Sequence, residues 1–301
     1  MGITRKMIYM ELLLNASLKV AKVQILMQSK LFSSLHIFNN ADMISISKSK
    51  LIRSLDRKKN REQQKLFLVE GVKMVQELLD ADNLFAPKVQ EIFATEEWIK
   101  HFAGFISKDI GLNETSEQEL RKLSHFVTAQ QVLALVKIPE QSLDMDTLSG
   151  EIVLGLEAIR DPGNLGTIVR TADWFGIRHI LCSPDSVDLY NPKVVQSTMG
   201  AMARTRVYYT DMEAVIRDPS LKNKPVYGTF LGGENIYETS LEPAPLILFG
   251  NESRGLSRQY DTYMKARLSI PSFAGGKGGS ESLNLASSVA VLCSEIKRRG
   301  L

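Results

Sequence analysis

Apolar positions in the first half of the chain recur with alternating helical and strand-like spacing from residue 49 to residue 136. Leu51, Ile52 and Leu55 lie on one face of a predicted basic amphipathic helix, and a capping-box-like run from Thr115 to Glu119 precedes another helix. The other predicted elements are strands over 66–69, 89–95 and 131–136 and helices over 71–79, 96–105 and 120–123. Alternating strands and helices predict a small α/β domain.

The second half of the chain alternates in the same way. The predicted elements are strands over 151–156, 179–182, 206–209, 226–230 and 246–249 and helices over 165–175, 192–203, 212–217 and 283–298. These strands are near-continuous apolar runs, which is typical of parallel strands covered on both faces. A parallel α/β sheet binds ligands at the loops that follow the carboxyl ends of its strands. We therefore expect the functional site in those loops.

The two patterned regions predict two domains. A domain over 46–138 is joined by a polar linker over 139–150 to a domain over 151–301. Residues 1–45 have no clear period and form an N-terminal extension with two open interpretations. They are a helical extension, or they precede a natural start at Met43, which opens a polar stretch typical of a bacterial chain.

The composition is that of an ordinary globular protein, and the charge is unevenly distributed. With 44% hydrophobic and 24% charged residues, the 301-residue chain is neither disordered, collagen-like nor a coiled coil. The net charge is +3, but residues 48 to 65 hold eight basic and two acidic residues. This basic segment is either a phosphate-binding surface for RNA or a solvated helix face.

Cysteine spacing and hydropathy narrow the class of protein further. Cys182 and Cys293 are far apart, without the Cys or His spacing of a disulfide framework or a zinc site, so we expect no metal. The apolar stretches are too short for a membrane span, and no cleavage site follows a signal-like core. We expect a cytoplasmic protein without membrane contact.

Three segments combine a buried strand with a loop of glycine, proline and small polar residues. The first, residues 156–170, contains an Asp-Pro-Gly turn, Asn164 and, two helical turns later, Arg170. The second, residues 246–257, places Gly250 and Glu252 directly after an apolar strand. The third, residues 268–288, is glycine-rich and includes Ser282 and Asn284. Each segment alone is also explained by helix capping or by a snorkelling arginine.

Other site motifs are missing from the sequence. The two glycine loops lack the Lys-Ser/Thr ending of a P-loop, so phosphate binding of that type is not supported. No GxGxxG, HExxH, GxSxG or EF-hand pattern occurs, which argues against nicotinamide enzymes, zincins and α/β-hydrolases.

Together, the three segments resemble the three motifs of the SpoU (TrmH-like) family of RNA ribose 2′-O-methyltransferases, within the SPOUT superfamily. The family's order and approximate spacing are kept over residues 151–296, although the stretch between Pro271 and Ser282 is longer and richer in glycine than usual. The resemblance implies a parallel-sheet domain tied in a deep trefoil knot. It also implies a preceding ribosomal-protein-L30e-like substrate-binding domain, S-adenosylmethionine as cofactor, and a site completed across a homodimer.

The resemblance assigns roles to individual residues. The implied catalytic residues are Arg170, Asn164, Glu252, Ser282 and Asn284. The implied cofactor-binding residues are Leu231, Gly232, Gly250, Ile270, Leu283 and Asn284. Since the pKa of an arginine exceeds about 12, we expect Arg170 to bind phosphate or stabilise the developing alkoxide at least as readily as to act as a base. Asn164 and Glu252 would orient it.

The extra N-terminal domain is typical of the rRNA-modifying members and favours rRNA as the substrate. Methylation of tRNA and an inactive RNA-binding module of the same fold are the alternatives. The residues expected to contact RNA are Arg53, Arg57, Lys58, Lys59, Arg61 and Arg160.

Overall fold

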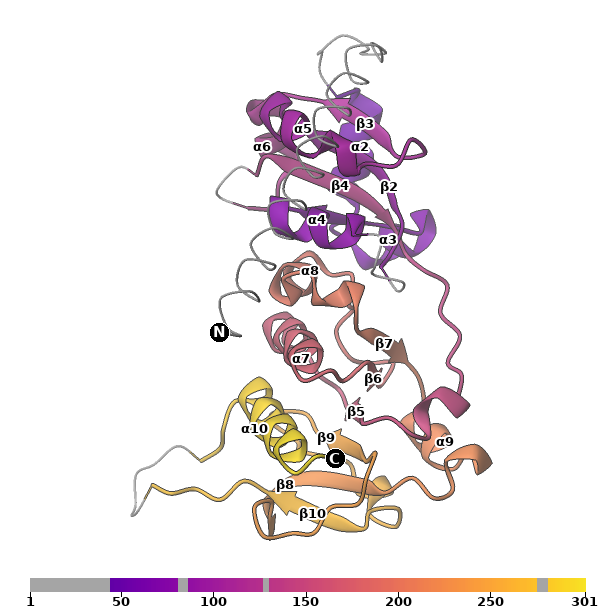
Figure 1. Ribbon diagram of the computed structural model, residues 1–301, viewed down its shortest axis with the longest axis vertical. Coiled ribbons are helices and arrows are strands. Elements are labelled where there is room, and N and C mark those ends of the chain that lie inside the picture. The colour runs from indigo at the N-terminus through magenta and orange to yellow at the C-terminus, as the bar shows by residue number, and fades with distance from the viewer. Residues whose placement is uncertain (1–43, 81–85, 127–129, 275–280) are drawn as a thin grey trace, which may run out of the picture.

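A computed structural model describes residues 44–80, 86–126, 130–274 and 281–301 as two α/β domains (Figure 1). The predicted α/β class is confirmed in both halves. The predicted extension over 1–45 lies almost entirely outside the described residues, as does part of the glycine-rich stretch before Ser282.

The N-terminal domain is built on a mixed four-stranded sheet in the order β1-β4-β2-β3. Its strands are β1 (Leu66–Glu70), β2 (Val89–Ala94), β3 (Gly111–Glu114) and β4 (Val132–Lys137). Its helices are α2 (Ile46–Ser54), α3 (Lys58–Gln64), α4 (Val72–Leu79), α5 (Glu96–Phe102) and α6 (Glu117–Leu123), with a 3₁₀ turn η1 (Ala103–Phe105). Strand β4 pairs antiparallel with β1 and β2, while β3 adds a parallel edge.

Two details of this domain differ from the prediction. The single basic helix is divided into α2 and α3, because Leu55 turns into the core and Arg57 is extended (φ −91°, ψ 129°). Arg61 then donates to the carbonyl oxygens of Leu55 and Asp56, which a continuous helix would have used itself. Strand β3 was not predicted, because its Gly-Leu-Asn-Glu sequence has no apolar run.

The C-terminal domain contains a six-stranded parallel sheet in the order β10-β8-β9-β5-β6-β7, which confirms the predicted parallel sheet. Its strands are β5 (Val153–Leu156), β6 (His179–Cys182), β7 (Arg206–Tyr209), β8 (Val226–Asn235), β9 (Leu246–Phe249) and β10 (Ala266–Ser269). Its helices are α7 (Pro162–Trp174), α8 (Pro192–Thr198), α9 (Met212–Ile216) and α10 (Leu285–Arg298). Short 3₁₀ turns are η2 (Asp146–Leu148), η3 (Ala201–Ala203), η4 (Pro219–Leu221) and η5 (Arg258–Tyr260).

Both faces of the parallel sheet are covered, because its side chains alternate between two cores. Helices α7, α8 and α10 cover one face of the sheet and α9 lies on the other (Figure 1). Leu154 and Ile180 belong to the core on the first face, and Val153 and Leu181 belong to the core on the second. The predicted helix over 192–203 ends earlier, at Thr198, because the two residues after it are left-handed.

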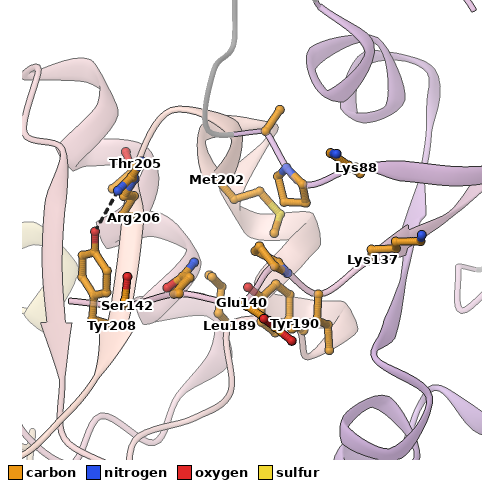
Figure 2. Close-up of a pocket in the computed structure, with 15 residues that line it drawn as sticks. Lys88, Lys137, Glu140, Ser142, Leu189, Tyr190, Met202, Thr205, Arg206 and Tyr208 are labelled. Atoms are coloured by element: carbon orange, nitrogen blue, oxygen red, sulfur yellow. Dashed lines mark hydrogen bonds between the residues drawn. The ribbon is translucent and has the colours of Figure 1, made fainter. Parts of the chain in front are cut away.

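The two domains share a junction. The core under α7 and α8 continues into the N-terminal sheet, where the Phe67 ring lies 4.7 Å from that of Tyr190. Arg204 forms ion pairs with Asp173 on α7 and with Glu77 on α4. A cavity of about 460 Å³ opens beside this junction, between Lys88 and Lys137 on one side and Arg206 on the other (Figure 2). The domains are therefore packed against each other as well as joined by the linker.

Candidate functional site: a polar cluster at the carboxyl edge of the parallel sheet

The three sequence motifs meet at one edge of the C-terminal sheet. Glu157 follows β5, Gly250 follows β9 and Ile270 follows β10, and these parallel strands end at the same side. Helix α7 begins at this edge because Asp161 caps it, accepting a hydrogen bond from the backbone N–H of Asn164 at 2.7 Å. The parallel order thus brings together residues that lie far apart in the sequence.

Asn164, Glu252 and Asn284, one from each motif, form a hydrogen-bonded set that we call the polar cluster. The Asn164 side-chain amide donates to Glu252 Oε1 at 2.8 Å. Asn284 donates its own side-chain amide to Asn164 Oδ1 at 3.0 Å. The structure thus connects three of the five predicted catalytic residues directly.

Helix α10 fixes the direction of these hydrogen bonds. Asn284 is its N-cap, and Asn284 Oδ1 accepts from the backbone N–H groups of Ala286 and Ser287 at 2.9 and 3.3 Å. Only the NH₂ group of Asn284 is then left for Asn164, so Asn164 must present its oxygen to Asn284 and its NH₂ to Glu252. The positive end of α10 therefore faces a chain of amide dipoles that ends on a carboxylate.

A second asparagine, not predicted from the sequence, holds the loop that leads to Asn164. Asn251 donates to the carbonyl oxygen of Ala158 at 2.8 Å, and its Oδ1 accepts the backbone N–H groups of Ser253 and Arg254. Ala158 is left-handed (φ 53°), an unfavourable conformation for a residue with a Cβ. In the sequence, only the position of Asn251 directly after Gly250 could have identified it.

Arg170 lies apart from the polar cluster. It is exposed and forms no hydrogen bond or ion pair with any residue in the part of the chain that the structure describes. Six residues separate it from Asn164 on α7, which at about 100° per residue turns the two side chains to different faces. Within a single chain Asn164 and Glu252 therefore do not contact Arg170, and the expectation that they orient it stays a prediction.

The predicted cofactor residues line the same edge, beyond the polar cluster. The apolar side chains of Leu231 and Leu283 are 77% and 52% exposed, and Ile270 is partly exposed. A Cβ added at Gly232 would meet nothing within 4 Å, whereas one at Gly250 would lie 2.2 Å from the backbone of Gly255 and Leu256. Ser282, also exposed, lies in the loop before α10.

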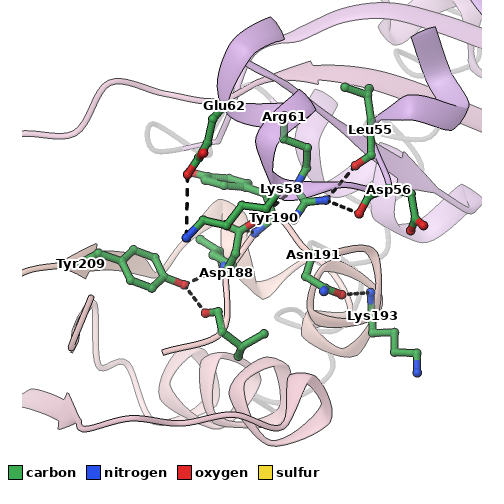
Figure 3. Close-up of polar contacts among 12 residues, drawn as sticks. Leu55, Asp56, Lys58, Arg61, Glu62, Asp188, Tyr190, Asn191, Lys193 and Tyr209 are labelled. Carbon is green, nitrogen blue, oxygen red and sulfur yellow. Dashed lines mark hydrogen bonds and ion pairs between the residues drawn. The ribbon is translucent and has the colours of Figure 1, made fainter. Parts of the chain in front are cut away.

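The predicted RNA-binding residues divide into exposed and buried side chains. Arg53, Arg57, Lys58 and Lys59 are exposed, and Arg160 is exposed but paired with Asp185 at 3.0 Å. The prediction for Arg61 is wrong: it is 2% exposed, and its Nη2 lies 2.5 Å from Asp188 Oδ2 across the domain junction (Figure 3). Charge counting missed this role because it does not show where a helix turns.

Metal and thiol chemistry find no support in the described residues. They contain no group of three or more His, Cys, Asp or Glu side chains able to hold a metal ion. Both cysteines are buried and free, and burial raises the pKa of the Cys293 thiol to about 12, so it is not a nucleophile. No helix in the described ranges has the length and apolar character to cross a membrane.

Comparison with known proteins agrees with this arrangement. The model of the SpoU rRNA methylase family matches residues 151–294. A TrmH-family structure from Porphyromonas gingivalis is 34% identical, covers 86% of this chain and all of that one, and superposes with a TM-score of 0.75. The chain belongs to the SpoU/TrmH family. A second model, the MRM3-like substrate binding domain, matches residues 21–134 and so begins within the predicted extension.

Two further relatives of this SpoU/TrmH-family chain each cover 80% of it or more. The 23S rRNA (guanosine(2553)-2′-O)-methyltransferase RlmP of Bacillus subtilis is 28% identical over 241 residues, which are 80% of this chain and 92% of RlmP. The structure of an AdoMet-bound rRNA methyltransferase from Sinorhizobium meliloti is 26% identical, with a TM-score of 0.73 over 86% of this chain and 98% of that one.

Proposed function

We propose that this protein transfers a methyl group from S-adenosylmethionine to a ribose 2′-hydroxyl of ribosomal RNA. The observation that carries the proposal is the polar cluster, in which each of the three motifs supplies one hydrogen-bonded side chain. RlmP and the Sinorhizobium protein, both named as rRNA methyltransferases, support the choice of rRNA. The division into an L30e-like substrate-binding domain over 46–138, a linker over 139–150 and a methyltransferase domain over 151–301 belongs to the same proposal.

The residues at the carboxyl edge fit S-adenosylmethionine. Leu231 in β8 and Leu283 in the loop before α10 expose apolar side chains, and an added Cβ at Gly232 would meet nothing within 4 Å. Such surfaces suit the flat face of an adenine, while loop backbone groups suit its polar edge. When bound, S-adenosylmethionine supplies a methyl group that its sulfonium already activates. We infer that Leu231, Gly232, Gly250, Ile270, Leu283 and Asn284 hold it.

The chain's own residues then have to position a ribose. Alignment of two reactants in one site accelerates a transfer that needs little other chemistry. Asn164 is held at both ends of its amide, so it offers a rigid wall for the ribose, and Ser282 and Asn284 line the other side. Arg170 supplies a permanent positive charge for the neighbouring phosphate or for the developing alkoxide.

A homodimer explains the position of Arg170. Trp174 lies four residues after Arg170, on the same face of α7, and is 85% exposed. Arginine and tryptophan are enriched at the centres of protein interfaces. We propose that this face packs against a second copy and brings Arg170 to that copy's polar cluster, with the C-terminal segment threaded as the family's trefoil knot, a rare exception to unknotted topology.

The decisive test is transfer of labelled methyl to rRNA and tRNA purified from cells that lack this protein. Wild type is compared with Arg170→Ala and with Arg217→Ala, a control at an arginine that is 67% exposed on the opposite face of the sheet. Label in rRNA that disappears only in Arg170→Ala supports the proposal. Label in tRNA corrects the substrate, and cofactor binding without any transfer to rRNA or tRNA contradicts the proposed reaction.

RNA capture is tested separately. Charge reversal of Arg57, Lys58 and Lys59 is expected to weaken rRNA binding and to reduce its salt dependence, because fewer phosphate counterions are released. Charge reversal of Lys100 and Arg121, exposed on α5 and α6, is the control. If both variants bind rRNA with equal affinity, the basic segment is a solvated helix face and not an RNA-binding surface.

A further inference from the structure

Residues 183–188, in the loop between β6 and α8, contact both the N-terminal domain and the segment that carries Asn164. At its far end, the Asp188 carboxylate accepts two hydrogen bonds from the buried Arg61, at 2.5 and 3.1 Å (Figure 3). Arg61 also holds the turn between α2 and α3 through two backbone carbonyls. The loop is thus anchored directly on the N-terminal domain.

At its near end, the same loop supports the backbone of residues 158 and 159. Ser183 Oγ accepts the N–H of Ala158 at 2.7 Å, and Ser186 Oγ accepts the N–H of Ile159 at 3.2 Å. The N–H of Val187 donates to the carbonyl oxygen of Ile159 at 2.7 Å. Ser183 and Ser186 are only 9% and 5% exposed, so water does not replace these bonds easily.

The supported segment is strained and leads directly to the polar cluster. Ala158 is held at φ 53°, and its carbonyl oxygen accepts from Asn251, which precedes Glu252. Asn164, which donates to Glu252, lies in the first turn of α7, six residues after Ala158. A strained residue persists only where its surroundings fix it. Here Ser183 fixes it from one side and Asn251 from the other.

We propose that the loop of residues 183–188 is a positioning element that couples the docking of the N-terminal domain to the geometry of the polar cluster. Ser183 and Ser186 are its positioning residues, and the Arg61–Asp188 pair is its anchor. The inference rests on the proposed function for its effect on turnover, but the coupling itself is a property of the folded chain. It gives the N-terminal domain a role in aligning the site in addition to RNA capture.

The first test measures the coupling without any reaction. Hydrogen exchange of the full chain is compared between wild type, Asp188→Asn and Asp218→Asn, a control carboxylate that caps an exposed turn. We expect Asp188→Asn to increase exchange in the segment 157–164, although the Asp188 side chain forms no hydrogen bond with that segment. Unchanged exchange there would overturn the coupling, whether or not the protein is a methyltransferase.

The second test separates positioning from folding and binding. Ser183→Ala is expected to lower kcat about tenfold while the KM for RNA and the affinity for S-adenosylmethionine stay within about twofold, because misplacement affects alignment most. Ser183→Thr keeps the hydroxyl and should restore kcat. Adding Ala158→Gly to Ser183→Ala should restore part of it, because glycine adopts positive φ without strain.

The outcomes distinguish the two proposals. An active wild type whose kcat is unchanged by Ser183→Ala would overturn the positioning role. The positioning role would also be overturned if Ser183→Ala lowers kcat, but Ser183→Thr does not keep kcat high and Ala158→Gly does not restore part of it. That result would show that the substitution damages the domain in general. An inactive wild type would overturn the proposed function, while the exchange experiment would still decide the coupling.

Discussion

Replacing Arg61 by leucine should destabilise the protein far more than the same change at any exposed arginine of the basic segment. Arg61 is 2% exposed, and its guanidinium donates to Asp188 and to the carbonyl oxygens of Leu55 and Asp56. Removing one partner of a buried ion pair costs about 3–5 kcal/mol, because the other charge stays buried without compensation. Since the Asp188 side chain is still 15% exposed, we expect a loss of stability at the lower end of this range, about 3 kcal/mol.

The matched control is Arg57→Leu, in the same segment but exposed and without a side-chain capping bond. A surface change of this kind alters the free energy of unfolding by about 0.5 kcal/mol or less. Urea unfolding of both variants measures the difference, and rRNA binding is measured alongside it. If Arg61→Leu costs no more stability than Arg57→Leu and weakens RNA binding equally, Arg61 contacts RNA as its sequence context predicted, and the junction described above is refuted.

Three further predictions follow from single contacts. Gly250→Ala should abolish cofactor binding in an equilibrium assay, because the new Cβ would lie 2.2 Å from neighbouring backbone atoms, whereas Gly150→Ala, which meets nothing within 4 Å, should bind normally. Asn164→Asp should reduce methyl transfer more than Asn164→Ala, because it places a second carboxylate against Glu252. Hydrogen bonds from Arg298 at the end of α10 and from its C-cap Arg299 lower the pKa of Glu295 from 4.5 to about 2. Glu295→Gln should therefore lower the free energy of unfolding, and the loss should be largest above pH 4.5, where the wild-type carboxylate is charged in both the folded and the unfolded state. The difference between the two proteins in urea unfolding should become smaller as the pH falls toward 2.

The location of the site could be predicted from the sequence because parallel strands impose it. Apolar runs such as 246–249 identify buried strands, and loops at the carboxyl ends of parallel strands meet at one edge. That reasoning correctly brings Asn164, Glu252 and Asn284 to a common edge. It does not supply the direction of their hydrogen bonds, which depends on Asn284 being the cap of α10.

Contacts between distant segments that carry no motif could not be predicted. Ser183 and Ser186 follow an apolar strand as small polar residues do in countless turns, and nothing local marks them as supports of Ala158. Strand β3 is similar: its pairing with β2 at the sheet edge, not its own composition, makes it a strand. Tertiary contacts determine the structural role of such residues, so local propensity gives no signal for them.

Arg61 shows why a charge count is a weak guide to an interface. The basic segment has eight positive residues, and a uniform helix would present most of them to solvent. Instead, helix α2 ends before the buried Leu55, and a new helix, α3, begins at Lys58. The change of direction between the two helices points Arg61 inward to Asp188. Its neighbours Lys58 and Lys59 remain exposed. The segment therefore contributes to both proposals: its exposed residues are proposed to contact RNA, and its buried Arg61 joins the N-terminal domain to the domain that holds the polar cluster.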